Sequence, residues 1–432
     1  MALELDKNLK GRLSKILAES IPQMLVEHGW FIDRSSIAKL SDGDSAIPSQ
    51  GLLRERLEQY VGEFCFSEFV YSYLTAFLRA NVKYQMEDGK KALGAIVPFL
   101  LTEDFSKELV ETFDRLPWSY TFSFLLPADL SVLLPDDKAE LVLSKSVRII
   151  RLDGELGGAY PMSTGNKDID DSIHQLGLLR FGEPEWEKGR LYLQIVSQGY
   201  LNVYGTTQPA VQAISKLKTF FGLCFSLRIL EHRFVYTPFQ PDEKCFVHRL
   251  VKDRGWVLDN KLSLDKNLSS MVSQISVGEL PGSDKDPELK YRYFSMWLNY
   301  FSVIFDSADA AGERIATACQ WLFESYYGDN ELLNFVQATV VLEILLGDKA
   351  ASDEIGLGEL LRSRCAYLIG TSRSQRDEIL RDFKEIYKVR SQIVHRGKRH
   401  LRENERRLLW QLVWMGHRVI QEETKLLSKD AD

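Results

Sequence analysis

The stretch QRDEILRDFKEIYKVRSQIVHRG, residues 375–397, has the spacing of a long amphipathic helix that ends at a glycine. Its apolar residues recur at steps of four and three positions, at Ile379, Phe383 and Ile386. This period places them on one face of a helix. The next step along the same face is Arg390. The sequence therefore predicts a helix that carries an arginine on the side intended for the core or for a partner.

An arginine on a packed face needs an opposite charge, because an unpaired buried guanidinium is costly. The upstream stretch NELLNFVQATVVLEILLG, residues 330–347, supplies one. There Val336 and Val340 step to Glu343 on an apolar stripe. We therefore expect an ion pair between Arg390 and Glu343. Such a pair either only holds the helices together or belongs to a functional site, and the sequence leaves both interpretations open.

A histidine follows the arginine by five positions. Five residues advance a helix by about 500°, which leaves Arg390 and His395 roughly 140° apart. Gly397 predicts that the helix ends here, so His395 lies in the last turn and can swing toward the arginine. A group that titrates near neutrality beside a permanent cation suits phosphodiester cleavage, in which histidine moves a proton and arginine stabilises the phosphate. This chemistry requires no metal.

The same segment is strongly basic in an acidic protein. Residues 388–407 contain eight lysines or arginines against two glutamates, a surplus of six positive charges in a chain with a net charge of −7. Such a cluster is typical of a surface that contacts a phosphate backbone. The candidate substrate-binding residues are Arg396, Lys398, Arg399 and Arg402. The alternative is an exposed, charged helix start with no ligand.

Two stretches together resemble a known family. LNFVQATVVLEILLGDK, residues 333–349, and YKVRSQIVHRG, residues 387–397, are similar to the paired segments of an Apea-like HEPN domain. The resemblance covers about residues 293–425, a third of the chain. It implies an all-α helical bundle, often dimeric.

The resemblance also assigns individual residues. Arg390 and His395 match the family's Arg-x4-6-His motif, which in HEPN domains commonly marks a metal-independent endoribonuclease. Ser391 matches the polar residue after the arginine, and Glu343 matches the glutamate of the earlier helix. Arg396 departs from the pattern, because many relatives have glycine directly after the histidine.

The implied function is an endoribonuclease of a toxin, abortive-infection or other antiviral defence system. The implied partners are RNA, a second copy of the chain through the HEPN domain, and an antitoxin or a trigger-sensing partner. No cofactor or metal is implied. The alternatives are a HEPN bundle that binds RNA or a partner protein without cleaving, and a toxin component silenced by an antitoxin.

The remaining sequence predicts an α+β protein in four segments. Residues 1–117 have mainly helical periodicity, and residues 118–275 mix strand-like and helical patterns. Residues 276–290 are polar, with two prolines and two glycines, and are predicted as a linker. Residues 291–432 are predicted to be all helical, and residues 1–275 as a regulatory or recognition region.

Three local predictions within these segments can be checked directly. Residues 52–80 have an apolar helical pattern with one irregularity. Residues 190–205, RLYLQIVSQGYLNVYG, look like two strands joined at Ser197–Gly199, which is a hairpin pattern. Residues 208–230 are predicted as a helix with Pro209 in its first turn.

Composition limits the classes of protein. The 432 residues are 45% hydrophobic, enough for a sizeable core, and the net negative charge argues against a protein that coats nucleic acid with its whole surface. Five well-separated cysteines form no disulfide framework, which fits a reducing, cytoplasmic setting. The longest apolar run, ALGAIVPFLL, has ten residues, whereas a membrane helix needs about 20.

Other chemical candidates are weaker. Neither glycine-rich nucleotide-binding motif, GxxxxGK or GxGxxG, is present. The acidic turn DIDDS, residues 168–172, has carboxylates but no complete ligand spacing for a hard cation. Cys245 and His248 have the spacing of zinc ligands without a second pair. The four remaining lone histidines are expected to be structural, and they are His28, His174, His232 and His417.

Overall fold

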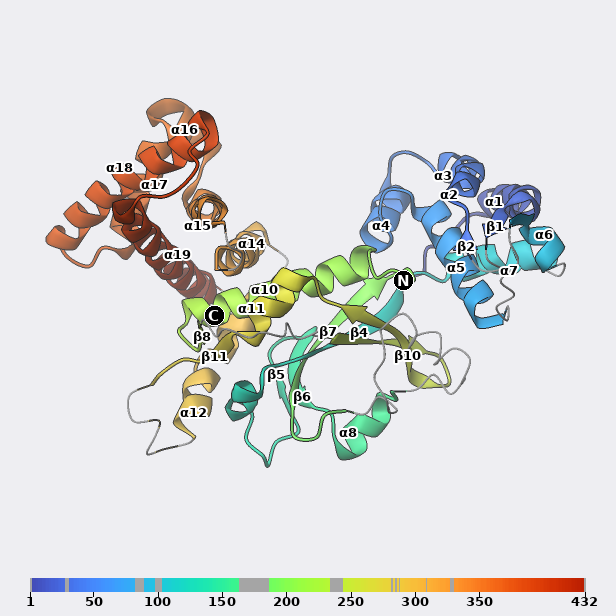
Figure 1. The fold of residues 1–432 in the computed structure, drawn as a ribbon, viewed down its shortest axis with the longest axis horizontal. Helices are drawn as coiled ribbons and strands as arrows, with labels where there is room; N and C mark the ends of the chain where they lie inside the picture. Colours follow the sequence, from blue (N-terminus) through green and yellow to red (C-terminus); the bar gives the residue numbers. More distant parts are fainter. Residues whose placement is uncertain are drawn as a thin grey trace.

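The structure is a computed structural model that describes residues 2–27, 31–81, 89–97, 103–162, 186–233, 244–280, 283, 286, 288–307, 309–326 and 330–430. The N-terminal helices and the C-terminal helices lie at opposite ends of the long axis, with a sheet between them (Figure 1). The predicted α+β class is confirmed.

The N-terminal region is mostly helical, as predicted, but it also contains a small sheet. Its helices are α1 (Lys7–Ser20), α2 (Arg34–Ile37), α3 (Ser41–Ala46), α4 (Leu52–Tyr60), α5 (Cys65–Asn81), α6 (Leu93–Ile96) and α7 (Glu103–Asp114). Its strands are β1 (Leu25–Glu27), β2 (Phe31–Ile32) and β3 (Lys90–Ala92), in the antiparallel order β2-β1-β3. Apolar side chains between Leu3 and Leu116, together with Tyr200, form a core separate from the main one.

The irregularity in the pattern of residues 52–80 is a complete break between α4 and α5. Gly62 has a φ of 132°, a backbone conformation that residues other than glycine rarely adopt. The helix starts again at Cys65, where Asp44 of α3 accepts a hydrogen bond of 2.9 Å from the Phe66 backbone N–H. Apolar residues of both helices pack in the N-terminal core.

The central sheet has six antiparallel strands in the order β10-β9-β4-β7-β6-β5. They are β4 (Trp118–Leu125), β5 (Glu140–Val142), β6 (Val147–Arg151), β7 (Leu191–Gly199), β9 (Lys244–Val251) and β10 (Gly255–Ser263). The side chains of β4 alternate, with Tyr120, Phe122 and Phe124 on the face that belongs to the main core.

The prediction of a hairpin within residues 190–205 is wrong. Ser197, Gln198 and Gly199 continue β7, and they pair with the first residues of β4. The chain leaves the sheet only at Tyr200, whose backbone N–H donates to the Tyr60 carbonyl oxygen at 2.9 Å. Docking on the N-terminal region, rather than a tight turn, therefore ends this strand.

Helix α10 (Gln208–Ser226) covers one face of the sheet and confirms the predicted helix, with Pro209 in its first turn. A two-stranded sheet of β8 (Leu230–His232) and β11 (Ile275–Val277) follows its C-terminal end. The smaller helices of this region are α8 (Gly154–Ala159) and α11 (Lys266–Ser273), with a 3₁₀ helix at Ala128–Leu133.

The C-terminal region is all helical in its described residues, as predicted. It contains α12 (Leu289–Ser295), α13 (Leu298–Phe305), α14 (Ala310–Glu324), α15 (Glu331–Leu346), α16 (Lys349–Ile355), α17 (Leu357–Ile369), α18 (Arg373–Arg396) and α19 (Glu403–Asp430). No helix in the described part of the chain is long and apolar enough to cross a membrane.

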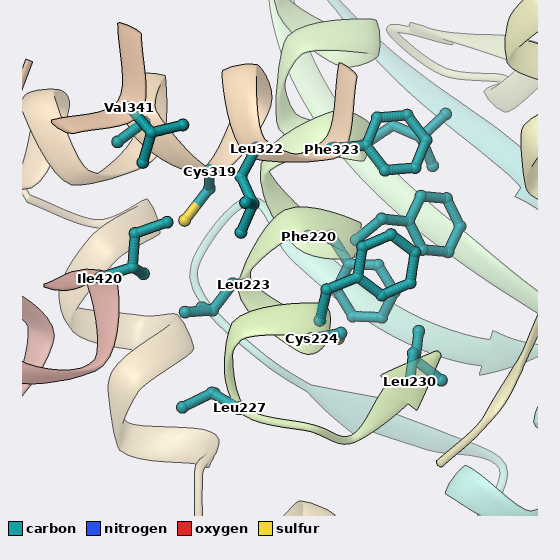
Figure 2. Packing of buried hydrophobic residues seen from close by; sticks show 14 of the residues in the cluster. Phe220, Leu223, Cys224, Leu227, Leu230, Cys319, Leu322, Phe323, Val341 and Ile420 are labelled. Carbon is teal, nitrogen blue, oxygen red and sulfur yellow. The ribbon is translucent and has the colours of Figure 1, made fainter. Parts of the chain in front are cut away.

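Residues 276–290 join two parts that share one core. Apolar side chains from the sheet, α10 and the C-terminal helices form a single continuous cluster. Helix α10 packs against α14 so closely that a Cβ on Gly222 would lie 1.9 Å from the Cys319 carbonyl oxygen. Figure 2 shows Leu223, Cys319 and Ile420 converging from three helices of this cluster. The parts of the chain before and after the predicted linker therefore pack together in one core.

Candidate active site

The helix that carries the motif begins and ends as its sequence predicts. The Ser372 side chain accepts a hydrogen bond from the Gln375 backbone N–H at the start of α18. Ile379, Phe383 and Ile386 are buried on one face. Gly397 follows the last helical residue with a φ of 63°, in the left-handed conformation that glycine adopts at helix ends.

Arg390 and Glu343 form the ion pair predicted from their positions. The Arg390 Nη2 lies 3.2 Å from the Glu343 Oε1, and the two side chains are 21% and 20% exposed. The contact lacks hydrogen-bond geometry, since Glu343 Oε1 and Arg390 Nε have no hydrogen-bond partner in the described structure. The Tyr387 ring lies beside the guanidinium, with its centroid 5.9 Å from Arg390 Cζ. The pair lies at the edge of the core and leaves hydrogen-bonding capacity unused.

Burial and the neighbouring guanidinium shift the pKa of Glu343 in opposite directions. Burial raises the pKa of Glu343 above its ordinary value, and the Arg390 guanidinium offsets only part of this effect. Burial also raises the pKa of the neighbouring Tyr387 hydroxyl. Burial therefore disfavours the charged form of Glu343, despite the nearby guanidinium.

His395 lies in the last turn of α18, as predicted, and its side chain is exposed. The helix continues through Arg396, so His395 stays on regular helix, about 140° around the axis from Arg390. Ser391 is partly buried on the same helix. Within one chain, Arg390 faces α15 while His395 faces solvent, so the expected swing of the histidine toward the arginine is not seen.

Lys398 has a structural position that the sequence did not reveal. Its Nζ lies 2.9 Å from Glu405 Oε1, and the side chains are 13% and 9% exposed. Glu405 Oε2 also accepts a hydrogen bond of 2.7 Å from the Arg402 backbone N–H. This is the glutamate half of a capping box at the start of α19. The structure thus places the Lys398 ammonium in the turn between α18 and α19, paired with Glu405, and its contact with substrate stays a prediction.

The other three predicted substrate-binding residues are exposed. We call Arg396, Arg399 and Arg402 the basic turn. None of these side chains has a hydrogen-bond or ion-pair partner among the residues that the structure describes. By contrast, Lys388 and Arg406 are paired, with nitrogen–oxygen distances of 3.5 Å to Glu385 and 2.8 Å to Glu331 respectively. The unpaired positive charge of residues 388–407 is thus carried by the basic turn and by Arg407, which is also exposed.

Sequence reasoning missed a cavity of about 480 Å³ that lies between the end of α10, β8 and α19. Tyr326 and His417 meet there, with 2.5 Å between the phenol oxygen and Nε2, and His232 contributes to the lining. In the sequence, His232 and His417 are 185 positions apart, and each stands alone. No local pattern could have brought them together.

The weaker metal candidates do not assemble in the described residues. His248 is fully buried, and its Nε2 lies 2.9 Å from the Pro161 carbonyl oxygen. Cys245 belongs to the main core beneath α10. In the part of the chain that the structure describes, no three histidine, cysteine or acidic residues are grouped as metal ligands. The DIDDS turn, His28 and His174 lie outside the described residues.

Comparison with known proteins does not add a relative. Neither the family models, nor the curated proteins, nor the solved structures give a match to this chain. The interpretation of the site therefore depends on the geometry given above.

Proposed function

We propose that the protein is a metal-independent endoribonuclease of the HEPN type, which acts in the cytoplasm as a toxin or antiviral defence effector. The observation that carries the proposal is the exposed His395 at the end of α18, followed within seven positions by the three exposed arginines of the basic turn and preceded on the same helix by Arg390. A cytoplasmic setting agrees with the five free, buried cysteines.

The proposed reaction uses the RNA strand as its own nucleophile. His395 takes the proton of a ribose 2′-hydroxyl, whose oxygen attacks the adjacent phosphorus. The bond from phosphorus to the 5′-oxygen breaks, and a proton returns to that oxygen as it leaves. The products are a 2′,3′-cyclic phosphate and a 5′-hydroxyl. Arginine stabilises the additional negative charge on the phosphate in the transition state.

The divergence of Arg390 and His395 within one chain favours an active site built by two chains. Two copies related by a twofold axis place the motif of each helix opposite the other, so that the arginine of one copy serves the histidine of the next. The basic turns of both copies then border one cleft. Glu343 holds Arg390 until the phosphate displaces it.

The test is cleavage of total RNA by purified protein in excess EDTA. We expect 2′,3′-cyclic phosphate ends, and a loss of at least about hundredfold in rate for His395→Ala. His400→Ala is the matched control, because His400 is another exposed histidine five positions later. Activity that EDTA abolishes and magnesium restores would reject the mechanism. Equal rates for His395→Ala and wild type would remove the histidine from it.

The second candidate is a helical module that binds RNA or a partner protein, including an antitoxin, without cleaving. Its support is the ion pair itself, since Glu343 occupies the guanidinium that the reaction needs. Binding of RNA by wild type and His395→Ala with equal affinity, and without product, would select this candidate.

A further inference from the structure

The cavity between the sheet region and the C-terminal helices has the properties of a ligand site, and we call it the junction pocket. Its volume of about 480 Å³ lies in the range of small-molecule sites. Residues from α10, β8, the segment after β11, the end of α14 and α19 all contribute. The pocket is therefore formed only when the two parts of the chain are packed together.

Aromatic side chains form much of the lining. Phe225 and Tyr326 are in contact, with ring centroids 5.1 Å apart, and the His417 ring lies 5.9 Å from the same tyrosine. Trp410 and Trp414, one turn apart on α19, complete this wall. Trp410 is 70% exposed. A tryptophan this exposed at the mouth of a cavity offers a flat apolar surface on which a planar ring can stack.

Most charged side chains that line the pocket have an ion-pair partner in the described structure, but Arg228 does not. Glu231 and Glu279 line the pocket, but Arg233 holds both, at 2.6 Å and 3.1 Å. Arg418 is paired with Glu422 at 3.1 Å. Arg228 is exposed, and its side chain has no ion-pair or hydrogen-bond partner among the described residues. Its guanidinium is the charge in this lining that remains available to a ligand.

The histidines of the pocket contribute polarity without charge near pH 7. Burial, together with the nearby Arg228, lowers the pKa of His417 to about 4. Burial also lowers the pKa of His232, which contacts the Gln274 side chain at 2.9 Å. Neither ring therefore adds a permanent charge, so Arg228 determines the sign of the ligand.

We propose that the junction pocket binds a small planar aromatic anion, with its ring against Trp410 and Trp414 and its phosphate or carboxylate on Arg228. The site is independent of the proposed ribonuclease, because it uses neither His395 nor the basic turn. Its ligand would contact β8 on one side and α19 on the other. The start of α19 is capped by Glu405, which accepts a hydrogen bond from the Arg402 backbone N–H in the segment after His395.

The test is direct binding to the full chain without RNA, by isothermal titration calorimetry and tryptophan fluorescence. The probes are adenosine 5′-monophosphate, adenosine, indole-3-carboxylate and inorganic phosphate. We expect saturable binding of an aromatic anion, at least about tenfold tighter than adenosine, and no saturable binding of phosphate alone. Saturation by the monophosphate identifies a phosphate ligand, and saturation by indole-3-carboxylate identifies a carboxylate ligand.

Two variants assign the contacts. Arg228→Asn removes the cation while keeping a residue that tolerates the left-handed backbone found there, with a φ of 56°. Trp410→Ala removes the exposed ring. Each should weaken binding of the aromatic anion at least about tenfold. Arg407→Ala is the control, because it removes an exposed arginine of α19 that is not in the lining.

Three results would overturn the proposal. They are the absence of saturable binding for both aromatic anions at millimolar concentration, equal affinity for adenosine and its monophosphate, and unchanged affinity in folded Arg228→Asn. Since no step involves RNA, a failed ribonuclease assay leaves this proposal intact, and failed binding here leaves the ribonuclease proposal intact.

Discussion

Arg390 of α18 and Glu343 of α15 face each other across 3.2 Å at the edge of the helical core, with about a fifth of each side chain exposed. This position differs from a fully buried salt bridge, because solvent and ligands can reach both groups. It also differs from a surface pair, because burial raises the pKa of the carboxyl group. The pair therefore combines features of a buried and of an exposed ion pair.

We expect the ion pair to contribute modestly to stability. Replacing Arg390 or Glu343 by glutamine should each lower the free energy of unfolding by about 1–2 kcal/mol, less than the 3–5 kcal/mol for breaking a fully buried pair. The smaller loss is expected because both side chains are partly exposed and the contact between them has poor hydrogen-bond geometry. Urea denaturation of both single variants and the double variant measures the coupling. Aggregation of either single variant would instead indicate a buried structural pair.

Lys398 should affect stability rather than RNA binding. Lys398→Ala removes the ammonium partner of Glu405, whose side chain is almost buried and gains little compensation from water. We therefore expect the free energy of unfolding to fall by about 1–3 kcal/mol. Arg399→Ala, at the exposed neighbouring position, should change stability by less than about 0.5 kcal/mol. Thermal and urea melts of the two variants give the comparison. Equal melting curves would contradict the assignment of Lys398 to the turn.

The basic turn should supply the salt dependence of RNA binding. Alanine at Arg396, Arg399 and Arg402 together should weaken binding and lower the slope of log affinity against log salt by about 2, because each lost phosphate contact removes about 0.7 for a single strand. Fluorescence anisotropy with labelled RNA at several salt concentrations gives this slope. Replacing the paired Arg406, which Glu331 and Glu403 already hold, is the control. An unchanged slope would make the turn an ordinary solvated surface.

The contact between α10 and α14 should tolerate no side chain at Gly222. A methyl group there would meet the Cys319 carbonyl oxygen at 1.9 Å, so the helices must separate. We expect Gly222→Ala to cost at least about 3 kcal/mol, at the upper end for overpacked cores. Gly11→Ala in α1 meets nothing within 4 Å and should be neutral or slightly stabilising. A Gly222→Ala protein with wild-type stability would show that the two helices are not held at this distance.

Stability should fall as the pH is lowered from 6.5 to about 4, in part through His248. Burial lowers the pKa of this histidine from 6.5 to about 4, so the unfolded chain binds a proton in this window that the folded chain does not. The contribution is fully present above pH 6.5 and is lost below, at about 3 kcal/mol in total. His248→Gln should flatten the dependence, whereas His400→Gln, at an exposed position, should not. If the unfolding free energy of all three proteins fell equally with decreasing pH, His248 would not be a source of this pH dependence.

Local periodicity was sufficient to predict the helices that pack on one face. The steps from Ile379 to Ile386 locate α18, and Gly397 locates its end, because both depend only on nearby residues. The pairing of Arg390 with Glu343 was also accessible, since each charge interrupts an apolar stripe and needs the other. These predictions are confirmed because local and tertiary preferences agree.

The wrong hairpin and the features that the sequence did not reveal arise where distant residues decide the structure. Gly199 has a turn-like local sequence, yet β4 offers it a partner and Tyr60 receives the chain that follows. Lys398 looks like its basic neighbours, and only the fold brings Glu405 to its ammonium. The junction pocket depends on segments nearly two hundred residues apart. None of these contacts leaves a pattern within one stretch of sequence.

The continuous core between the sheet and the C-terminal helices also limits how such a chain can be recombined. Genetic exchange of modules works best where few contacts cross the boundary. A graft of residues 291–432 onto another protein would uncover Phe301 and Phe323, which now pack against Phe220 and Phe221 of α10. A graft near residue 117 would divide the chain between two separate core clusters and would uncover Tyr200, which packs against Phe69 of α5. We therefore expect natural or engineered chimaeras to replace the first 117 residues and to inherit the remainder as one unit.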